Sequence, residues 1–222
     1  MKNLFRGDIL RNELIKWYYE KTAERLIKNL KKRNINGYFV NSSEEVNSLV
    51  EKIIPEECVV GWGGSLTMNA CDTISFLKKN GYKCLDRAEA KTTEEREEIL
   101  RKHFSVDAYF CGINAITMDG EIVQLDGNGN RVAAMIFGPK KVILLAGMNK
   151  VVEDFDAALK RIKRISPMNA KRLKLDTPCT ETGYCVDCKV QNRICESYGV
   201  ITDSTRKKDR FHVILIGEEL GL

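Results

Sequence analysis

Apolar and polar residues follow two periodicities along this chain, one typical of helices and one typical of buried strands. Residues 8–33 carry apolar side chains at mostly helical spacing among many charges, which predicts one long amphipathic helix at the N-terminus. Residues 141–146 form a continuous aliphatic run, as in a central strand that is buried on both faces. Strand-like and helical stretches alternate, so we expect an α/β fold with a mostly parallel sheet and helices on both of its faces.

The remaining elements follow from shorter patterns. We expect strands at 38–40, 58–60, 82–85, 107–112 and 211–216, and helices at 44–53, 65–79, 93–104, 132–137 and 153–165. Ser42 and Glu45 have the spacing of a capping box before the second helix, and a further helix is expected to begin near Pro167. Asp119-Gly120 between alternating apolar residues predicts a β-hairpin over 116–125.

No internal repeat or linker interrupts the pattern, so residues 1–222 are expected to form a single domain with a cysteine-rich segment at 176–198. The composition, 43% hydrophobic and 30% charged, excludes a disordered or collagen-like chain. The formal net charge of +5 is spread along the sequence, and the densest basic run has only three residues, 206–208, which argues against a nucleic-acid partner. The longest strongly apolar stretch, 142–147, is far too short for a membrane span, and we expect a cytoplasmic protein.

A glycine-rich loop at 61–69 lies between a predicted strand and a predicted helix. Backbone N–H groups of Gly63 and Gly64 can converge on an anion there, and the hydroxyl groups of Ser65 and Thr67 can donate to the same ligand. The loop matches neither GxGxxG nor the P-loop, because no Gly-Lys-Ser/Thr follows. A tight turn with Ser65 as an ordinary helix cap is the structural alternative.

Polar residues also follow the next predicted strand and the hairpin. Asn114 comes after the strand at 107–112, and Asp126, Asn130 and Arg131 come after the hairpin. Arg131 could bind a carboxylate or phosphate through two parallel hydrogen bonds. The alternative is that these side chains only satisfy turns and caps.

The motifs taken together resemble the LUD (lactate utilisation) domain family over nearly the whole chain. They are Gly61-Trp62-Gly63-Gly64-Ser65-Leu66-Thr67, Gly112-Ile113-Asn114-Ala115-Ile116-Thr117, Asp119-Gly120-Glu121-Ile122-Val123, Gly127-Asn128-Gly129-Asn130-Arg131-Val132-Ala133, Gly138-Pro139-Lys140-Lys141-Val142-Ile143 and Ile216-Gly217-Glu218-Glu219-Leu220-Gly221. The resemblance implies a fold like that of the NagB/RpiA/CoA-transferase superfamily, which includes sugar-phosphate isomerases and CoA transferases. It also implies a link to the oxidation of lactate to pyruvate by a multi-subunit iron–sulfur system.

The same resemblance indicates where catalytic groups would lie. Isomerases of the superfamily tend to carry a carboxylate in the second loop, and Asn114 occupies the comparable position here. The catalytic candidates are therefore Asn114 itself and the carboxylates of Asp126 and Glu218. His103 and His212 belong to no recognisable constellation.

Four cysteines lie within seventeen positions near the C-terminal end, with the spacing C-x5-C-x2-C-x6-C. Cys185 and Cys188 form a CxxC pair that can grip one metal ion, and Cys179 and Cys195 would complete four-coordination. The ligand set suits zinc or a [4Fe–4S] cluster, and the redox setting of the family favours the cluster. A loop of free or oxidised thiols is the structural alternative.

The leading hypothesis is a family subunit, a component of an oxidoreductase complex, that binds an anionic small molecule at the two loops. It would act with iron–sulfur oxidoreductase subunits in the oxidation of a 2-hydroxy acid. The alternatives are a free-standing isomerase or acyl/CoA-type transferase with a structural zinc site, and a non-catalytic regulatory binding module. The sequence leaves the substrate, the metal and the formation of a homo-oligomer open.

Overall fold

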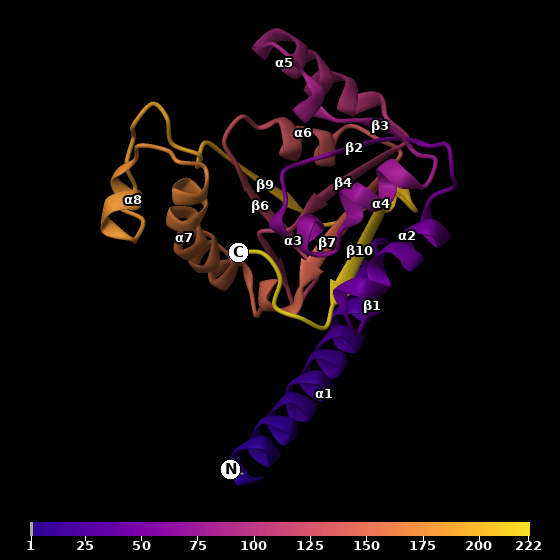
Figure 1. Ribbon diagram of the computed structural model, residues 1–222, viewed down its shortest axis with the longest axis vertical. Helices are drawn as coiled ribbons and strands as arrows, with labels where there is room; N and C mark the ends of the chain where they lie inside the picture. Colours follow the sequence, from indigo (N-terminus) through magenta and orange to yellow (C-terminus); the bar gives the residue numbers. More distant parts are fainter. Residues whose placement is uncertain (1) are drawn as a thin grey trace.

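Six parallel strands form the main sheet, in the order β1-β10-β7-β4-β2-β3 (Figure 1). This computed structural model describes residues 2–222, with side chains from residue 8 onward. The strands are β1 (Asn36–Val40), β2 (Val59–Trp62), β3 (Lys83–Leu85), β4 (Ala108–Gly112), β7 (Lys141–Gly147) and β10 (Phe211–Ile216). The expectation of a mostly parallel sheet is confirmed, and the aliphatic run at 141–146 is one of its two innermost strands.

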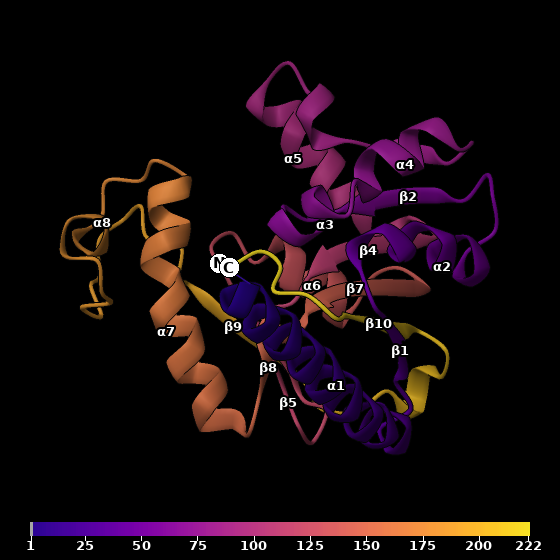
Figure 2. The same cartoon turned by 60° about the horizontal axis from the view of Figure 1, so that its bottom comes forward.

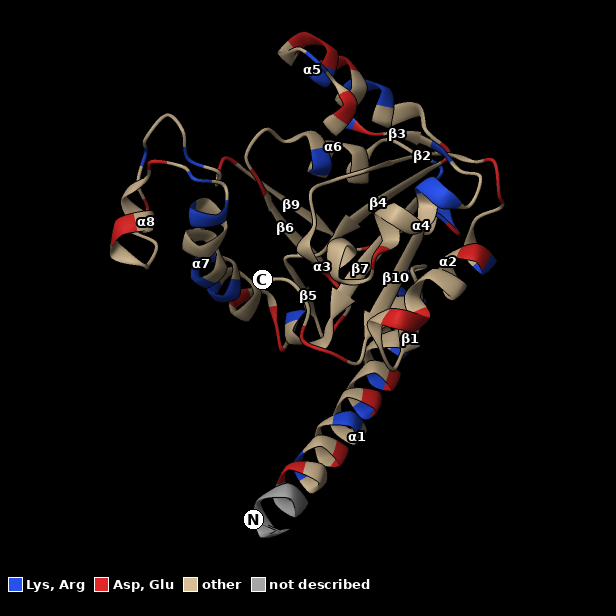
Figure 3. Cartoon of the chain, viewed as in Figure 1, with Lys and Arg blue, Asp and Glu red and all other residues tan. Residues whose placement is uncertain are grey.

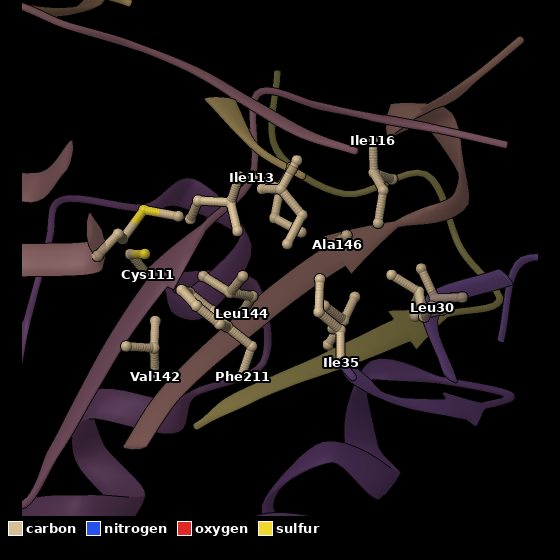
Figure 4. Close-up of a cluster of buried hydrophobic side chains, with 14 of the residues drawn as sticks. Leu30, Ile35, Cys111, Ile113, Ile116, Val142, Leu144, Ala146 and Phe211 are labelled. Carbon is tan, nitrogen blue, oxygen red and sulfur yellow. The ribbon is translucent and has the colours of Figure 1, made fainter. Parts of the chain in front are cut away.

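The side chains of β7 alternate between two apolar layers. Val142 and Leu144 face a cluster that contains Leu30 and Ile35, which lie at and after the end of the long N-terminal helix (Figure 4). Ile143 and Leu145, which point the opposite way, pack in a second cluster with residues of the helices that follow β1 and β2. Burial on both faces explains why this strand reads as an unbroken aliphatic run.

A second, smaller sheet has the order β8-β5-β6-β9. Its strands are β5 (Ala115–Thr117), β6 (Ile122–Asp126), β8 (Val151–Val152) and β9 (Ser197–Ile201). β5 and β6 form the predicted antiparallel hairpin, and Gly120 in its turn has a φ of +93° that suits glycine. The sequence analysis missed β9, because this five-residue strand has a glycine at its centre and follows the polar cysteine segment.

The helices cover the sheets as expected, although several boundaries differ. They are α1 (Lys2–Lys32), α2 (Val46–Ile53), α3 (Leu66–Ala70), α4 (Thr73–Lys79), α5 (Thr93–Lys102), α6 (Asn130–Ile136), α7 (Phe155–Arg172) and α8 (Pro178–Thr182). The single helix expected over 65–79 is wrong, because Asp72 adopts a left-handed conformation (φ 49°) and separates α3 from α4.

Two further expectations need correction. α7 continues through Pro167 instead of ending before it. Ile162, Ile165 and Pro167 are buried, so the packing of this helix outweighs the loss of the backbone hydrogen bond that proline cannot make. The capping box is incomplete: the Ser42 side chain makes no cap hydrogen bond, and a 3-10 turn precedes α2.

The long helix α1 packs on the main body only through its C-terminal part (Figures 1 and 2). Leu26 and Leu30 are fully buried, whereas Leu14, Trp17 and Tyr18 are 55%, 59% and 61% exposed. Across residues 2–222, no helix combines the length and the apolar character that crossing a membrane requires.

The buried guanidinium group of Arg210 holds the end of α6 onto the sheet. It donates to the carbonyl oxygens of Pro139 (2.9 Å), Ala134 (3.1 Å) and Met135. Arg210→Met should therefore leave three buried carbonyl groups without their donor and lower the free energy of unfolding by about 3 kcal/mol. Urea unfolding would measure the loss, with Arg206→Met at an exposed position as the matched control. Equal stability of the two variants would contradict this role.

Candidate functional site

A cavity of about 260 Å³ lies where β2, β4 and β7 end. Carboxyl ends of parallel strands meet at one edge of a sheet, so the segments that follow them can share a ligand. Residues 64–67 after β2, residues 112–114 at the end of β4 and Lys150 after β7 all line the cavity, together with residues 125–128 at the end of the hairpin strand β6. The two loops singled out in the sequence therefore lie at one site.

Most of the predicted site residues line this cavity, but two of them do not. Its lining includes Gly64, Ser65, Thr67, Asn114, Asp126, Asn130 and Arg131. Gly63 and Glu218 are absent from the lining that the described residues form. The Gly63 N–H donates to the carbonyl oxygen of Phe110 (2.9 Å) and so extends the sheet instead of facing a ligand.

The glycine loop presents free donors but little helix dipole. The N–H groups of Gly64 and Ser65 have no acceptor within residues 2–222. The Ser65 Oγ accepts from the Met68 N–H (3.2 Å) and caps α3, as the structural alternative proposed. α3 has only five residues, so cationic side chains must supply most of the attraction for an anion.

Asn114 fixes the position of Arg131. Its Oδ1 accepts from the Leu125 N–H (2.9 Å) and from Arg131 Nη2 (3.0 Å), and Arg131 Nη2 also donates to the Leu125 carbonyl oxygen (2.7 Å). The Asn114 N–H donates to Gln124 Oε1 (3.1 Å). Asn114 thus ties the end of β4 to β6 and holds one edge of the Arg131 guanidinium group, which leaves its other N–H groups for a ligand.

Asp126 is engaged by the backbone. Its Oδ1 accepts from the Gly127 N–H (3.1 Å) and its Oδ2 from the Val132 N–H (3.0 Å) at the start of α6. Both carboxylate oxygens therefore have a structural role at the site. Arg131 Nε lies 3.9 Å from Oδ2, so a salt bridge adds to the positioning of the guanidinium group.

The charge around the cavity is strongly unbalanced. Five cationic side chains line it against one acidic side chain, that of Asp126; the cations belong to Arg87, Arg96, Arg131, Lys150 and Arg172. The Arg87 guanidinium group has neither a hydrogen bond nor an ion pair with any described residue, and its partial burial lowers its pKa. A Cβ atom at Gly64 would lie 2.8 Å from Arg87 Nη2, which places this cation directly over the glycine loop.

Lys150 is the most deeply buried of these cations. Its side chain is 4% exposed, and Nζ donates to Thr67 Oγ1 (2.7 Å). Burial, together with the guanidinium groups of Arg161 and Arg131, lowers the pKa of Lys150 to about 7. Arg161 itself donates to the carbonyl oxygens of Asn149, Asn114 and Leu222, so its charge stays fixed behind the cavity wall.

The two histidines take no part in the cavity that the described residues line. His103 Nε2 lies 2.9 Å from the Leu85 carbonyl oxygen, and His212 Nδ1 lies 3.0 Å from the Tyr38 hydroxyl group. Burial lowers the pKa of each ring. Both are buried, His212 in β10 and His103 in the 3-10 turn that follows α5.

The cysteine segment lies beside the cavity. Ile194 contributes to the lining, and the Glu196 N–H donates to the Asp126 carbonyl oxygen (3.0 Å). The thiols of Cys188 and Cys185 lie close enough to Cys195 to raise its pKa, in addition to the effect of burial. The fourth thiol, Cys179, is 3.3 Å from Thr177 Oγ1.

The four thiols are not arranged as ligands of one ion. Among residues 2–222, no three His, Cys, Asp or Glu side chains are gathered closely enough to hold a metal. All four cysteines are partly exposed and unpaired in the described structure, so the donor set that zinc or an iron–sulfur cluster requires is present chemically but is not assembled here.

Comparison with known proteins identifies the family of this chain and a solved structure with a similar fold. The profile of the LUD domain family matches residues 23–216, which is most of the chain. The chain belongs to the LUD domain family. A DUF162 family protein from Deinococcus radiodurans has a similar crystal structure, with a TM-score of 0.52 and 13% identity over 89% of this chain and 98% of that one. The expected resemblance is therefore confirmed.

Two other solved structures match about half of this chain. The β subunit of eIF2B from Chaetomium thermophilum is 16% identical over 52% of this chain and 44% of that one, with a TM-score of 0.35. Ribose 5-phosphate isomerase from Plasmodium falciparum is 17% identical over 50% and 52%, with a TM-score of 0.33. A comparison with curated proteins gives no match. Membership of the LUD family supports a role associated with lactate utilisation in general.

Sequence reasoning missed most of the cations of this LUD-domain site. Arg87, Arg96 and Arg172 stand on separate segments of the chain, and only the fold brings them together. Lys150 could have been predicted from the sequence, because it is the only charged residue between the aliphatic run of β7 and the two valines of β8. A charged side chain at the end of a central buried strand has little room to reach solvent.

The lowered pKa of Lys150 has a consequence for stability. Between about pH 7 and pH 10 the unfolded chain holds a proton on this amine that the folded protein has released, so folding should become more favourable as the pH rises. The difference in free energy of unfolding between the wild type and Lys150→Met should therefore increase between about pH 7 and pH 10 and stay constant below pH 7. Urea unfolding of the two proteins in chloride buffers would measure this difference. If their free energies of unfolding changed in parallel with pH, the lowered pKa of Lys150 would be contradicted.

Proposed function

We propose that this LUD-domain protein binds a small carboxylate of the 2-hydroxy or 2-oxo acid class, such as lactate or pyruvate, in the cavity at the strand ends. The observation that carries the proposal is the excess of cationic side chains, five against one acidic side chain, around a cavity of about 260 Å³. Lys150 is buried and Arg87 is partly buried, and neither has a counterion among the described residues; such cations are costly, and a bound anion lowers that cost. The volume of the cavity is also slightly below the usual range for ligand pockets, which favours a small acid over a coenzyme.

Three groups can orient such an acid. Arg131, held on one edge by Asn114 and Leu125, can present its remaining N–H groups to the ligand carboxylate. Arg87 can add charge from above the glycine loop, where the free N–H groups of Gly64 and Ser65 also lie. Lys150, which also lines the cavity, can contact the oxygen on the second carbon of the acid.

We further propose that the protein serves as a subunit of an oxidoreductase system that converts the 2-hydroxy acid to the 2-oxo acid. Cys179, Cys185, Cys188 and Cys195 would hold an iron–sulfur centre, preferably [4Fe–4S], which supplies one-electron transfer when bound. This segment borders the cavity through Ile194, so a centre held there would lie beside the bound acid. The four thiols, which are not gathered in the described structure, would have to come together to hold it.

The proposed isomerase receives less support from the geometry. Asp126 already accepts two backbone hydrogen bonds, and Glu218 stands outside the lining formed by the described residues. A sugar isomerase needs a carboxylate that is free to move a proton between carbon atoms. Neither Asp126 nor Glu218 offers such a free carboxylate to a ligand in this cavity.

Arg87 offers a clean test of anion binding because its guanidinium group makes no hydrogen bond that holds the described fold together. Arg87→Gln should weaken binding of lactate and pyruvate about tenfold, or about 1.4 kcal/mol, with unchanged stability. Isothermal titration calorimetry would measure it, with Arg101→Gln on the exposed side of α5 as the control. Equal affinities of wild type and Arg87→Gln, or no binding of either acid, would contradict the proposed site.

The cysteine centre has an independent test. Protein purified without oxygen should contain about four iron atoms per chain and absorb visible light, as a [4Fe–4S] cluster does. The double variant Cys185→Ser/Cys188→Ser should lose the metal and keep the sheet folded, and Cys58→Ser at a partly exposed position outside the segment should keep it. One zinc and no iron would favour a structural site. Anaerobic protein with reduced thiols and no metal would refute the centre.

A further inference from the structure

Lys150 is buried at the cavity, but its amine has few partners in the described chain. It ends a 3-10 turn, Met148–Lys150, directly after β7, and its side chain is 4% exposed while still lining the cavity. An ammonium group has three N–H bonds, and within residues 2–222 only Thr67 Oγ1 accepts one of them. No carboxylate of the described chain forms a salt bridge with it, although buried ammonium groups are normally paired.

The space in front of the amine is shaped by Gly112. A Cβ atom at this position would lie 2.6 Å from Ser65 Oγ and 3.7 Å from Lys150 Nζ. The serine hydroxyl and the lysine amine therefore converge over a residue without a side chain. Ser65 and Lys150 both line the cavity, so a ligand bound there can contact the hydroxyl group and the amine.

The surroundings keep a large share of this amine uncharged near neutral pH. The guanidinium groups of Arg161 and Arg131 and the burial of the side chain act in the same direction. The thiols of Cys71 and Cys111 also lie nearby, and burial raises their pKa values to about 11 and about 12, so they remain protonated and supply no counter-charge. A free amine has a lone pair that can attack carbon.

We propose that Lys150 is a nucleophile that forms an imine with the carbonyl carbon of a bound 2-oxo acid of the pyruvate class. This inference rests on the proposed binding of such acids and adds a covalent step to it. Arg131 and Arg87, which hold the carboxylate, would place the neighbouring carbonyl group toward Lys150 and Ser65.

The step is balanced without a redox partner. The lone pair of the amine forms the N–C bond while the carbonyl oxygen takes up a proton, which gives a carbinolamine. Loss of that oxygen as water then gives the imine, protonated on nitrogen, so that amine, ketone and one proton become iminium and water. The Ser65 hydroxyl group can donate a hydrogen bond to the carbonyl oxygen as it gains negative charge.

The test is reductive trapping in the full-length protein. Wild-type protein is incubated with pyruvate, reduced with borohydride and examined by intact mass and peptide mapping. We expect one added carboxyethyl group, located on Lys150 and saturable with pyruvate concentration. Lactate has no carbonyl group and should give no adduct under the same conditions.

Two variants sharpen the result. Lys150→Met should reduce trapping at least tenfold while binding pyruvate by calorimetry, and Lys141→Met, which removes a partly exposed lysine paired with Asp209, should trap as the wild type does. Peptide mapping of the wild type decides the site even if Lys150→Met does not fold. Pyruvate binding without an adduct on Lys150, or label spread over surface lysines, would overturn the imine alone. Absence of pyruvate binding would overturn the proposed function as well.

Discussion

The burial of β7 on both faces is the constraint from which the rest of this structure follows. Its aliphatic side chains anchor two apolar layers, and neighbouring strands pair with it in parallel on either side. Parallel pairing brings the ends of β2, β4 and β7 to one edge, because all three strands run the same way. The glycine loop, Asn114 and Lys150 meet there although more than 80 residues separate the first from the last.

The site built on this edge combines fixed and free cations. Arg161 donates to three carbonyl oxygens, and Arg131 is fixed along one edge by Asn114 and Leu125, so the fold determines where these charges stand. Arg87 and Lys150 have few or no partners in the described chain and remain available to a ligand. The fixed cations provide a positive electrostatic potential in the cavity, and the free cations can form hydrogen bonds and ion pairs with a ligand. This combination is expected at a site that binds an anion.

The sequence predicted the layers of this fold well and the site only in part. Strands such as β7 and β10 could be predicted because burial on both faces leaves a continuous apolar run, and the hairpin because Asp-Gly needs a special backbone conformation. The break at Asp72 and the continuation of α7 through Pro167 could not, since tertiary packing overrides local preference at both places. The clustering of Arg87 with Arg131 also depends on contacts distant in sequence, which no local pattern encodes.

Electrostatics connects the stability of this protein with its proposed chemistry. A lysine buried beside two guanidinium groups lowers the stability of the folded state at neutral pH, because charge on it is unfavourable. The same environment lowers the pKa of this amine to about 7 at the point where the strand ends converge, so part of it is uncharged at neutral pH. An anionic ligand would offset the repulsion among the cations, and its carbonyl group would meet the amine. The feature that lowers the stability of the protein would therefore also make the cavity selective for an acid with a reactive carbon beside its carboxylate, as proposed above.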